Sequence, residues 1–592
     1  MTTPLEDYAM IGDGETVALV SRHGSIDWLC LPRFDSPACC AALLGNTGNG
    51  RWSIASASPY AASRQRYEDD SLILVTEFDC EKGCLRLTDL MPVRNENPLV
   101  LRIVECTEGE VDVRNEADFR FDYGNMPPWI TLDDGRITFH VGPDAVVLDG
   151  FEDFERPDTL VVEQFRLKEG EKRVFAATYD GRDAKGLSGV DPERLLAETR
   201  DAWHGWIGKC RASTRNDAML RRSLITLKAL IHRPTGGLVA APTTSLPEQP
   251  GGSMNWDYRY CWLRDATFTL EALAECGFVD EARDWRDWIL RAVAAAPDKL
   301  QIMYRVDGSR RLDEAELPWL SGYRFARPVR IGNAAAGQFQ LDVYGEVIQM
   351  LHASEKAGMD RTEQGRQLEH ALVRHIVDVW RQPDAGLWES RGKPRHYTYS
   401  KVMAWVGIDR FLGGKGGREI DAPARRRLEA TREEIRAVIL EEAYNPGLRA
   451  FTSYFGGDEL DAALLLLPKL GFLPAEDERM AETIVLIEER LAGDGLVRRH
   501  RMDTLVPEGA FIACSFWLAD VQIRQGRHEA ASRTIDQALA RASSTGLMSE
   551  EYDVTSQRLT GNFPQALSHL ALVQALLAEA RMGENPQKGA AQ

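Results

Sequence analysis

The chain has little cysteine for its length, and it lacks both a long apolar run and an excess of positive charge. Its 10 cysteines among 592 residues are too few and too irregularly spaced for a disulfide scaffold. Neither a second cysteine pair at the required spacing nor a histidine cluster accompanies Cys80 and Cys84. We therefore expect small buried thiols and no metal site.

Targeting and membrane signals are also missing. Residues 1–7 have neither the basic nor the apolar region of a signal peptide, and no window approaches 18 uninterrupted apolar residues. The formal net charge of −19 disfavours nucleic acid or an anionic membrane as the main partner, because phosphate binding needs clustered Lys and Arg. We expect a cytoplasmic protein with a neutral substrate and enough residues for two or more domains.

The first third of the chain reads as short β-rich runs separated by Gly, Asp and Pro turns. This pattern predicts an antiparallel β-sandwich over residues 1–190. The clearest runs lie at residues 16–20, 72–76, 99–104, 160–163 and 173–177.

After residue 200 the hydrophobic period lengthens to that of amphipathic helices. A helical linker is expected over 191–215, a helical domain over 216–583 and a polar tail over 584–592. This periodicity admits a solenoid, a bundle or a closed ring, although no repeat at solenoid spacing is present. The expected helices lie near residues 265–295, 338–358, 364–381, 398–412, 421–442, 459–470, 477–492, 510–525, 527–543 and 565–582.

The loops between these helices hold the unusual residues, most densely over 256–265. Tyr258, Tyr260 and Trp262 alternate, so an extended segment would place them on one face. Asp265 could simply cap the helix that follows. Sugar recognition explains the cluster better, because flat rings stack on a pyranose while Arg264 and Asp265 supply fixed donors and acceptors for its hydroxyls.

Two acidic segments suggest the chemistry. Glu389 follows Trp388 in one loop, and Glu550-Glu551 lies in a second loop 161 positions later. Hydrolysis of a glycosidic bond needs one protonated carboxyl group, which protonates the leaving oxygen, and one ionised carboxylate, which activates water or attacks the sugar. If these segments meet in space, the chain is a glycosidase.

Taken in order, these motifs resemble glycoside hydrolase family 15, which includes glucoamylases, glucodextranases and certain bacterial trehalases. The resemblance spans essentially the whole chain. It implies an N-terminal antiparallel β-sandwich followed by a C-terminal (α/α)6 barrel. The motifs that carry it are Tyr258-x-Tyr260-x-Trp262-x-Arg264-Asp265, Leu387-Trp388-Glu389, Met548-Ser549-Glu550-Glu551-Tyr552-Asp553 and the stretches 25–37, 327–333 and 515–518.

The resemblance implies a role for each matching residue. Glu389 is the general acid and Glu550 the general base, with Trp388 and the like charge of Glu550 expected to raise the pKa of Glu389. Glu551 is expected to support Glu550 as a hydrogen-bond acceptor. The remaining implied contacts are Tyr258 with the attacking water, Trp262 in the wall of the first subsite, and Arg264 and Asp265 with the hydroxyls of the terminal glucose.

The implied reaction inverts the anomeric carbon, so an α-glucoside yields β-glucose and the two carboxyl groups are expected about 6.5–9.5 Å apart. It needs no metal or cofactor. Ser390 stands where fungal glucoamylases have a second Glu, which affects the leaving-side subsite. We expect an exo-acting hydrolase of a small α-glucoside (trehalose, isomaltose or a malto-oligosaccharide) rather than of starch.

Other readings stay open. His396, Arg327 and Arg330 fit either sugar contacts or ordinary structural pairs, Glu508 either a cap or a pocket residue, and Glu346 is expected to be structural. Two functions compete with hydrolysis. A disaccharide phosphorylase would not need a base such as Glu550, and a non-catalytic carbohydrate-binding protein would not need both carboxylates.

Overall fold

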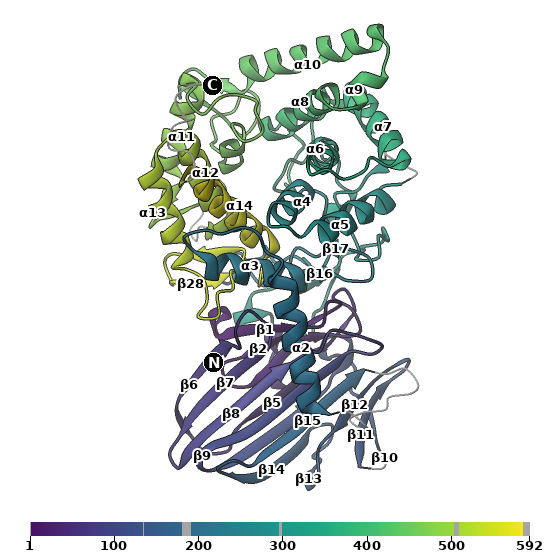
Figure 1. Cartoon of the computed structure of the whole chain (residues 1–592), viewed down its shortest axis with the longest axis vertical. Helices are drawn as coiled ribbons and strands as arrows, with labels where there is room; N and C mark the ends of the chain where they lie inside the picture. The colour runs from purple at the N-terminus through teal and green to yellow at the C-terminus, as the bar shows by residue number, and fades with distance from the viewer. Residues whose placement is uncertain (1, 134, 180–190, 295–298, 502–507, 584–592) are drawn as a thin grey trace.

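The computed structural model describes residues 2–133, 135–179, 191–294, 299–501 and 508–583. Figure 1 shows a strand-built N-terminal region and, above it, a helical region that contains the C-terminus. The expected polar tail, 584–592, lies outside the described residues. No helix within those described ranges combines the length and apolar character needed to cross a bilayer.

The N-terminal region is an antiparallel β-sandwich, as the sequence predicts. The long strand β9 joins its two layers, because its first half pairs with β8 and β15 while its second half pairs with β5 and β14. The strands are β1 (Tyr8–Gly12), β2 (Val17–Ser21), β3 (Ser25–Cys30), β4 (Ala38–Cys40), β5 (Arg51–Ser56), β6 (Tyr60–Tyr67), β7 (Leu74–Cys80), β8 (Gly83–Leu90), β9 (Leu99–Asp118), β10 (Trp129–Asp133), β11 (Arg136–Val141), β12 (Asp144–Asp149), β13 (Phe154–Glu155), β14 (Val161–Lys168) and β15 (Lys172–Tyr179).

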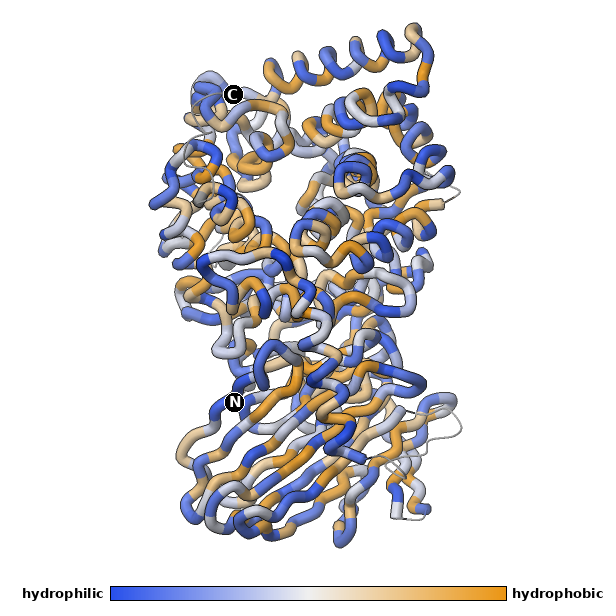
Figure 2. The backbone as a smooth tube through the Cα atoms, viewed as in Figure 1, coloured by the Kyte–Doolittle hydropathy of each residue, from blue (hydrophilic) through white to orange (hydrophobic). Residues whose placement is uncertain are grey.

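The sandwich core follows from the period-two pattern of these strands. In β5, Trp52 and Ile54 are buried while Arg51 and Ser53 are only half-buried, because successive side chains point to opposite faces. Figure 2 shows the same alternation of hydrophobic and hydrophilic residues along the strands. The buried faces of both layers meet in one hydrophobic cluster, which includes Trp52 and Phe175.

The helical region is a closed double ring, the (α/α)6 barrel that the resemblance implies. Each inner segment contacts the next around the ring, and α14 closes on α4. The inner segments are α4 (Ala266–Glu275), α6 (Asp342–Lys356), α8 (Thr398–Gly413), the 3₁₀ turn Ala462–Leu466, α12 (Ile512–Arg524) and α14 (Ala566–Gly583). The outer helices are α3 (Asp217–Leu230), α5 (Val279–Ala292), α7 (Glu363–Val379), α10 (Ala422–Glu442), α11 (Glu478–Arg490) and α13 (His528–Leu539).

Inner and outer helices differ in how much of their circumference is apolar. Residues on all sides of α8 are buried, from Thr398 through Leu412, whereas Ile435 and Ile439 are the buried residues of α10. A helix that is apolar all round must be enclosed, while one with a narrow apolar stripe packs at the periphery. The distribution of apolar residues around each helix therefore agrees with the place of α8 in the inner ring and of α10 in the outer ring.

Two expected helices differ from the structure. The run near 459–470 forms only the 3₁₀ turn Ala462–Leu466, in which the side chain of Asp461 accepts a capping hydrogen bond from the N–H of Ala463. The run near 265–295 divides into α4 and α5, because Gly277 adopts a φ of +96° after Cys276 and ends the first helix.

Short strands and helices connect the larger elements. Helix α2 (Pro192–Ile207) occupies the expected linker and runs between the two regions in Figure 1. The other short helices are α1 (Phe121–Gly124) and α9 (Gly416–Glu419). The short strands are β16 (Ile231–His232), β17 (Gly237–Leu238), β18 (Cys261–Trp262), β19 (Met303–Tyr304), β20 (Ala315–Glu316), β21 (Arg330–Ile331), β22 (Tyr444–Asn445), β23 (Ala450–Phe451), β24 (Ala492–Gly493), β25 (Leu496–Val497), β26 (Ala510–Phe511), β27 (Glu551–Asp553) and β28 (Arg558–Thr560).

Arg259 fixes the aromatic-rich loop against the β-sandwich. Its guanidinium is buried and pairs with Asp257, and it also donates to the hydroxyl of Tyr123 at 2.8 Å and to the carbonyl of Ser36 at 2.9 Å. Both acceptors belong to the N-terminal region. The sandwich therefore holds the loop that carries Tyr258.

Candidate active site

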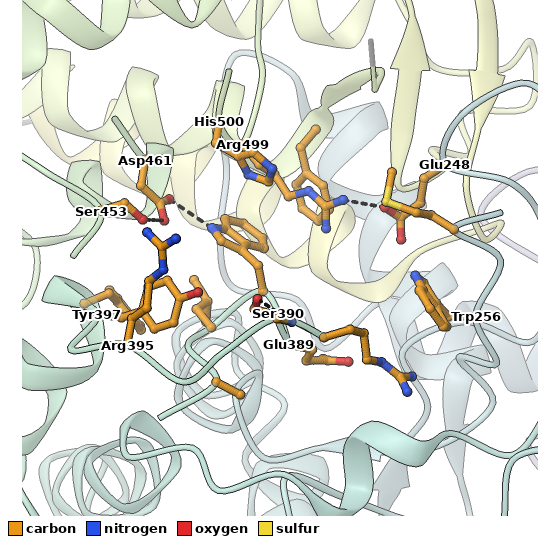
Figure 3. Close-up of a pocket in the computed structure, with 18 of the residues that line it drawn as sticks. Glu248, Trp256, Glu389, Ser390, Arg395, Tyr397, Ser453, Asp461, Arg499 and His500 are labelled. Carbon is orange, nitrogen blue, oxygen red and sulfur yellow. Dashed lines mark hydrogen bonds and ion pairs between the residues drawn. The ribbon is translucent and has the colours of Figure 1, made fainter. Parts of the chain in front are cut away.

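A cavity of about 570 Å³ opens among the barrel loops, within the size range of small-molecule sites. The loops that reach it come from distant parts of the sequence, as Figure 3 shows for Glu248, Trp256, Glu389 and Arg499. Six residues that the sequence indicated line this cavity: Tyr258, Arg264, Arg330, Trp388, Glu389 and Glu550.

The loop between α7 and α8 holds Glu389 in an unusual backbone conformation. Glu389 has a φ of +56°, a left-handed geometry that L side chains rarely adopt and that persists where the surroundings enforce it. The amide of Gln338 donates to the carbonyls of Glu389 at 3.2 Å and Ser390 at 3.1 Å. These bonds help to fix the turn that presents the carboxyl group.

The carboxyl group of Glu389 makes two contacts through a single oxygen. Trp262 Nε1 donates to Oε1 at 2.6 Å, and Arg264 Nη1 lies 3.5 Å from the same atom. Burial raises the pKa of Glu389, while Arg264 and the Trp262 bond act in the opposite direction.

The cause of this raised pKa differs in part from the sequence expectation. Burial acts first, and Asp265 supplies the main like charge. Trp388 instead directs its Nε1 to Asp461 at 2.9 Å. The indole that contacts the carboxyl group is therefore that of Trp262.

Glu550 lies at the other wall of the cavity, fully buried just before β27. Its Oε2 accepts the backbone N–H of Asn562 at 3.3 Å, and the side chain of Tyr258 lies close enough to act on its pKa. Burial raises the pKa of Glu550 to about 7, with Arg499 and Tyr258 opposing the shift. Its Oε1 is buried without a hydrogen-bond partner among the described residues.

Arg264 and Asp265 form an ion pair at the start of α4. Arg264 Nε lies 2.9 Å from Oδ1 of Asp265. Asp265 occupies the N-cap position, but its side chain makes no capping hydrogen bond. The side chain of Asp265 therefore does not cap the helix. Its carboxylate instead orients Arg264 toward Glu389.

Four predicted site residues do not line the cavity. Trp262 and Asp265 lie directly behind it, in contact with Glu389 and Arg264 respectively. Glu551 is buried 3.4 Å from Arg499. His396 stacks on Phe455 at 5.8 Å between ring centroids and is absent from the lining.

Several lining residues were not singled out from the sequence. Arg499, Glu248, Asp461 and Trp256 all face the cavity. A partial signal existed for three of them, because Arg499 lies in a basic pair between two barrel helices, Glu248 lies in a Pro-rich loop just before the aromatic cluster, and Trp256 opens that cluster. Asp461 carried no comparable pattern of its own.

Arg330 belongs to the rim of the cavity. Its guanidinium lies 4.7 Å from the ring centroid of Trp256, and that of Arg391 lies 4.5 Å from the same ring. Glu314 contacts both arginines, at 3.8 Å and 3.0 Å. This cluster borders Ser390, so the rim beside Glu389 is cationic and aromatic.

Three carboxyl groups behind Glu550 gather around one guanidinium. Ligand atoms of Glu248, Glu508 and Glu551 lie within 4.8 Å of one another, a separation that a metal ion could bridge. Arg499 contacts all three carboxyl groups. Because a cation already sits among them, the residues fit an arginine-centred cluster better than a metal site.

The arrangement suits acid and base chemistry on a bound sugar. Glu389 and Glu550 reach one cavity from different loops, and aromatic rings together with Arg264 surround them. Both carboxyl groups have raised pKa values, which is common at catalytic sites.

Known proteins resemble this chain along its whole length. The profile described as Glycosyl hydrolases family 15 matches residues 214–535 and 522–577, and the profile described as Trehalase-like, N-terminal matches residues 1–150. A trehalase of Mycobacterium tuberculosis is 36% identical over 626 positions, covering 98% of this chain and 90% of that protein. A trehalase of Thermoplasma volcanium is 33% identical over 582 positions, covering 96% and 92% respectively.

A solved structure supports the fold independently. A bacterial glucoamylase complexed with acarbose matches with a TM-score of 0.74 at 13% identity, covering 98% of this chain and 94% of that one. At this identity the likeness concerns the fold alone, which is the β-sandwich and (α/α)6 barrel described above.

Proposed function

This chain belongs to the glycosyl hydrolases of family 15, and from that membership we propose that it hydrolyses trehalose to two molecules of glucose. The long relatives named trehalases, each matched over at least 90% of its length, favour this disaccharide among the small α-glucosides. The observation that carries the chemical proposal is the presence of Glu389 and Glu550 in the lining of one cavity.

In the proposed mechanism Glu389 is the general acid. Trp262 and Arg264 both contact Oε1, so the proton to be delivered would sit on Oε2. Burial keeps this carboxyl group protonated to higher pH than a free Glu. Protonation of the bridging oxygen allows the bond to one anomeric carbon to break.

Glu550 is the proposed general base. Asn562 occupies its Oε2, while Oε1 has no partner among the described groups and is the atom that would accept a proton from water. Tyr258 would help to hold that water beside Glu550. Attack on the face opposite the departing oxygen would invert the anomeric carbon.

The substrate contacts follow from the same geometry. Arg264, oriented by Asp265, would bind hydroxyl groups of the glucose whose bond is cleaved, and Trp262 would support the wall of that subsite. Trp388 would contact the sugar from the cavity side. Arg330, which lies near Ser390 at the rim, would contact the leaving glucose.

Stereochemistry tests this mechanism directly. Inversion at one carbon of trehalose releases one β-glucose and one α-glucose, whereas retention releases α-glucose only. A ¹H NMR time course within the first minutes, before mutarotation, distinguishes the two outcomes. Exclusive early α-glucose would refute inversion.

A substrate screen tests specificity. Glucose release from trehalose, isomaltose, maltose, kojibiose, nigerose and soluble starch should be fastest with trehalose. A faster rate with isomaltose or maltose would overturn the choice of substrate while leaving the reaction class in place. Parallel detection of glucose 1-phosphate in phosphate buffer addresses the phosphorylase alternative, which the base-like position of Glu550 disfavours.

A further inference from the structure

Three buried carboxyl groups contact the guanidinium of Arg499 at the wall of the cavity, beside the fully buried Glu550. Glu248, Glu508, Glu550 and Glu551 are 2%, 4%, 0% and 0% exposed, and Arg499 is 8% exposed. Arg499 makes close contacts with Glu248 and Glu508 and lies 3.4 Å from Glu551. Figure 3 shows Arg499 and Glu248 joined on one side of the cavity.

The charges of this cluster do not balance if every carboxyl group is ionised. An uncompensated buried charge costs several kcal/mol in a protein interior, and one guanidinium compensates one carboxylate. His500 lies 4.0 Å from Glu508, but its side chain is 31% exposed. Protons must therefore occupy some of the carboxyl groups near neutral pH.

Glu551 locates one of these protons. Neither of its oxygens accepts a hydrogen bond from any described N–H or O–H group, although the side chain is completely buried. One of its oxygens lies within 4.8 Å of an oxygen of Glu508, and two buried carboxyl groups this close avoid like-charge repulsion when one of them holds a proton.

The electrostatic directions agree with this geometry. Burial and the neighbouring Glu508 raise the pKa of Glu551. Burial would also raise the pKa of Glu508, but Arg499 and the hydrogen bond from Glu551 outweigh it and lower that pKa. Burial raises the pKa of Glu248 as well, against the opposing effect of Arg499, so Glu248 holds its proton to higher pH than a free Glu.

We propose that Glu508 and Glu551 share one proton and carry one negative charge, that this charge pairs with Arg499, and that the pair thereby determines the pH at which Glu550 ionises. The proposal rests on the assignment of Glu550 as the base. Glu508 and Glu551 are positioning residues in this scheme, because they act through Arg499 and do not touch the substrate.

The physical effect on Glu550 has a definite sign. A free positive charge on Arg499 would favour the ionised form of Glu550, whereas the negative charge of the pair cancels that attraction and adds a like charge nearby. The pair therefore keeps Glu550 protonated to higher pH. Among the described residues, the other charged or titratable groups that face this region are Tyr258, Glu389, Asp461, Arg499, His500 and, from α12, Cys514.

The test is the pH profile of kcat/KM for trehalose in four variants of the full chain: Glu508→Gln, Glu551→Gln, the double variant, and Glu248→Gln as the matched control. The double variant should shift the acid limb to lower pH by about one unit, the size of an opposite-charge effect. Each single variant should shift it less than half as far, because the remaining carboxyl group keeps the charge. Glu248→Gln should leave it in place.

Four outcomes would overturn the proposal. If the acid limb of kcat/KM does not move in the double variant, the pair does not act on Glu550. If one single variant shifts the limb as far as the double variant does, the negative charge belongs to that one residue and is not shared. A shift in Glu248→Gln as large as that of the double assigns the charge to Glu248. Wild-type activity is first compared with and without EDTA, and the variants are then assayed with EDTA present. Loss of wild-type activity on adding EDTA would place a cation, not a proton, in the cluster.

A second measurement applies if the double variant does not fold. Infrared difference spectra at pH 8 should show that either single variant loses a protonated-carboxyl band present in the wild type, because the lone remaining carboxyl group ionises beside Arg499. A persistent band in either variant contradicts the shared proton.

If Glu550→Gln itself retains activity, the proposed function fails. If Glu550→Gln is inactive and the acid limb of the double variant does not move, only this inference is rejected.

Discussion

The indole Nε1 of Trp262 donates a hydrogen bond of 2.6 Å to Oε1 of Glu389, across 127 positions of sequence. This bond stabilises the ionised form of the proposed acid and lowers its pKa against the opposing effect of burial. Trp262→Phe should therefore raise the pKa of Glu389 and move the alkaline limb of kcat/KM to higher pH.

The matched control for Trp262→Phe is Trp405→Phe in α8. Trp405 is also buried, but its Nε1 has no hydrogen-bond partner among the described residues. Its replacement removes an indole of the same size without touching either carboxyl group. An equal shift of the alkaline limb in both variants would show that the Trp262 bond does not control Glu389.

Glu389→Gln and Glu550→Gln should each reduce turnover of trehalose by at least about 100-fold, because loss of a positioned proton-transfer group costs roughly 10² to 10⁴ in rate. Circular dichroism should show an intact fold in both variants. Turnover close to wild type in either one would refute the role assigned to that residue.

Glu346→Gln serves as a control for the loss of a buried carboxyl group. Burial raises the pKa of Glu346 to about 8, and Tyr399 donates to its Oε1 at 2.7 Å. At pH 7 this group is mostly protonated, so Gln closely mimics it and turnover should stay near the wild-type value.

Gly561 lies against the proposed base. A Cβ added there would lie 2.6 Å from Oε2 of Glu550, and the residue has a φ of +73°. Gly561→Ala should displace Glu550, and because misplacing a catalytic group by about 1 Å can cost up to roughly 10²-fold, kcat should fall by at least about tenfold.

Gly526→Ala separates this displacement from backbone strain. Gly526 has a φ of +72°, but an added Cβ would meet nothing within 4 Å. Both variants should lose about 1 kcal/mol of stability from the left-handed backbone, which thermal melts would measure. A comparable loss of kcat in Gly526→Ala would contradict the steric explanation.

The acid limb of kcat/KM should lie near neutral pH in the wild-type enzyme. Burial raises the pKa of Glu550 to about 7, and a base must be ionised to accept a proton from water. As pH falls through this pKa the base gains a proton, so kcat/KM should fall about tenfold per pH unit. A plateau that continues down to pH 5 would show that Glu550 ionises well below this value.

Much of the fold could be predicted from local patterns. The period-two runs of residues 1–190 and the longer period after residue 200 depend on which faces each element buries, so they appear directly in the sequence. The prediction of a helix near residues 459–470 was wrong, because the buried cluster Ala462–Leu466 is equally compatible with an α-helix and with a 3₁₀ turn. An apolar run does not specify its hydrogen-bond pattern.

The candidate site was predictable where its residues lie close together in the sequence or match a family motif. Tyr258, Arg264, Trp388, Glu389 and Glu550 all line the cavity. His396 follows Glu389 closely in sequence, yet its ring stacks on Phe455. Proximity along the chain does not determine which way a side chain points in an irregular loop.

The sequence by itself determined the two-part architecture and the pair of carboxylates, because hydrophobic period and ordered motifs are local properties. Periodicity left the arrangement of the helices open, and the resemblance carried by the motifs implied the double ring. Only the tertiary structure brought Glu248, Arg499, Glu508 and Glu551 together beside Glu550. The pKa of a carboxyl group depends on burial and on charges within a few ångströms. Those neighbours come from loops separated by up to 303 positions, and closure of the barrel alone makes them adjacent.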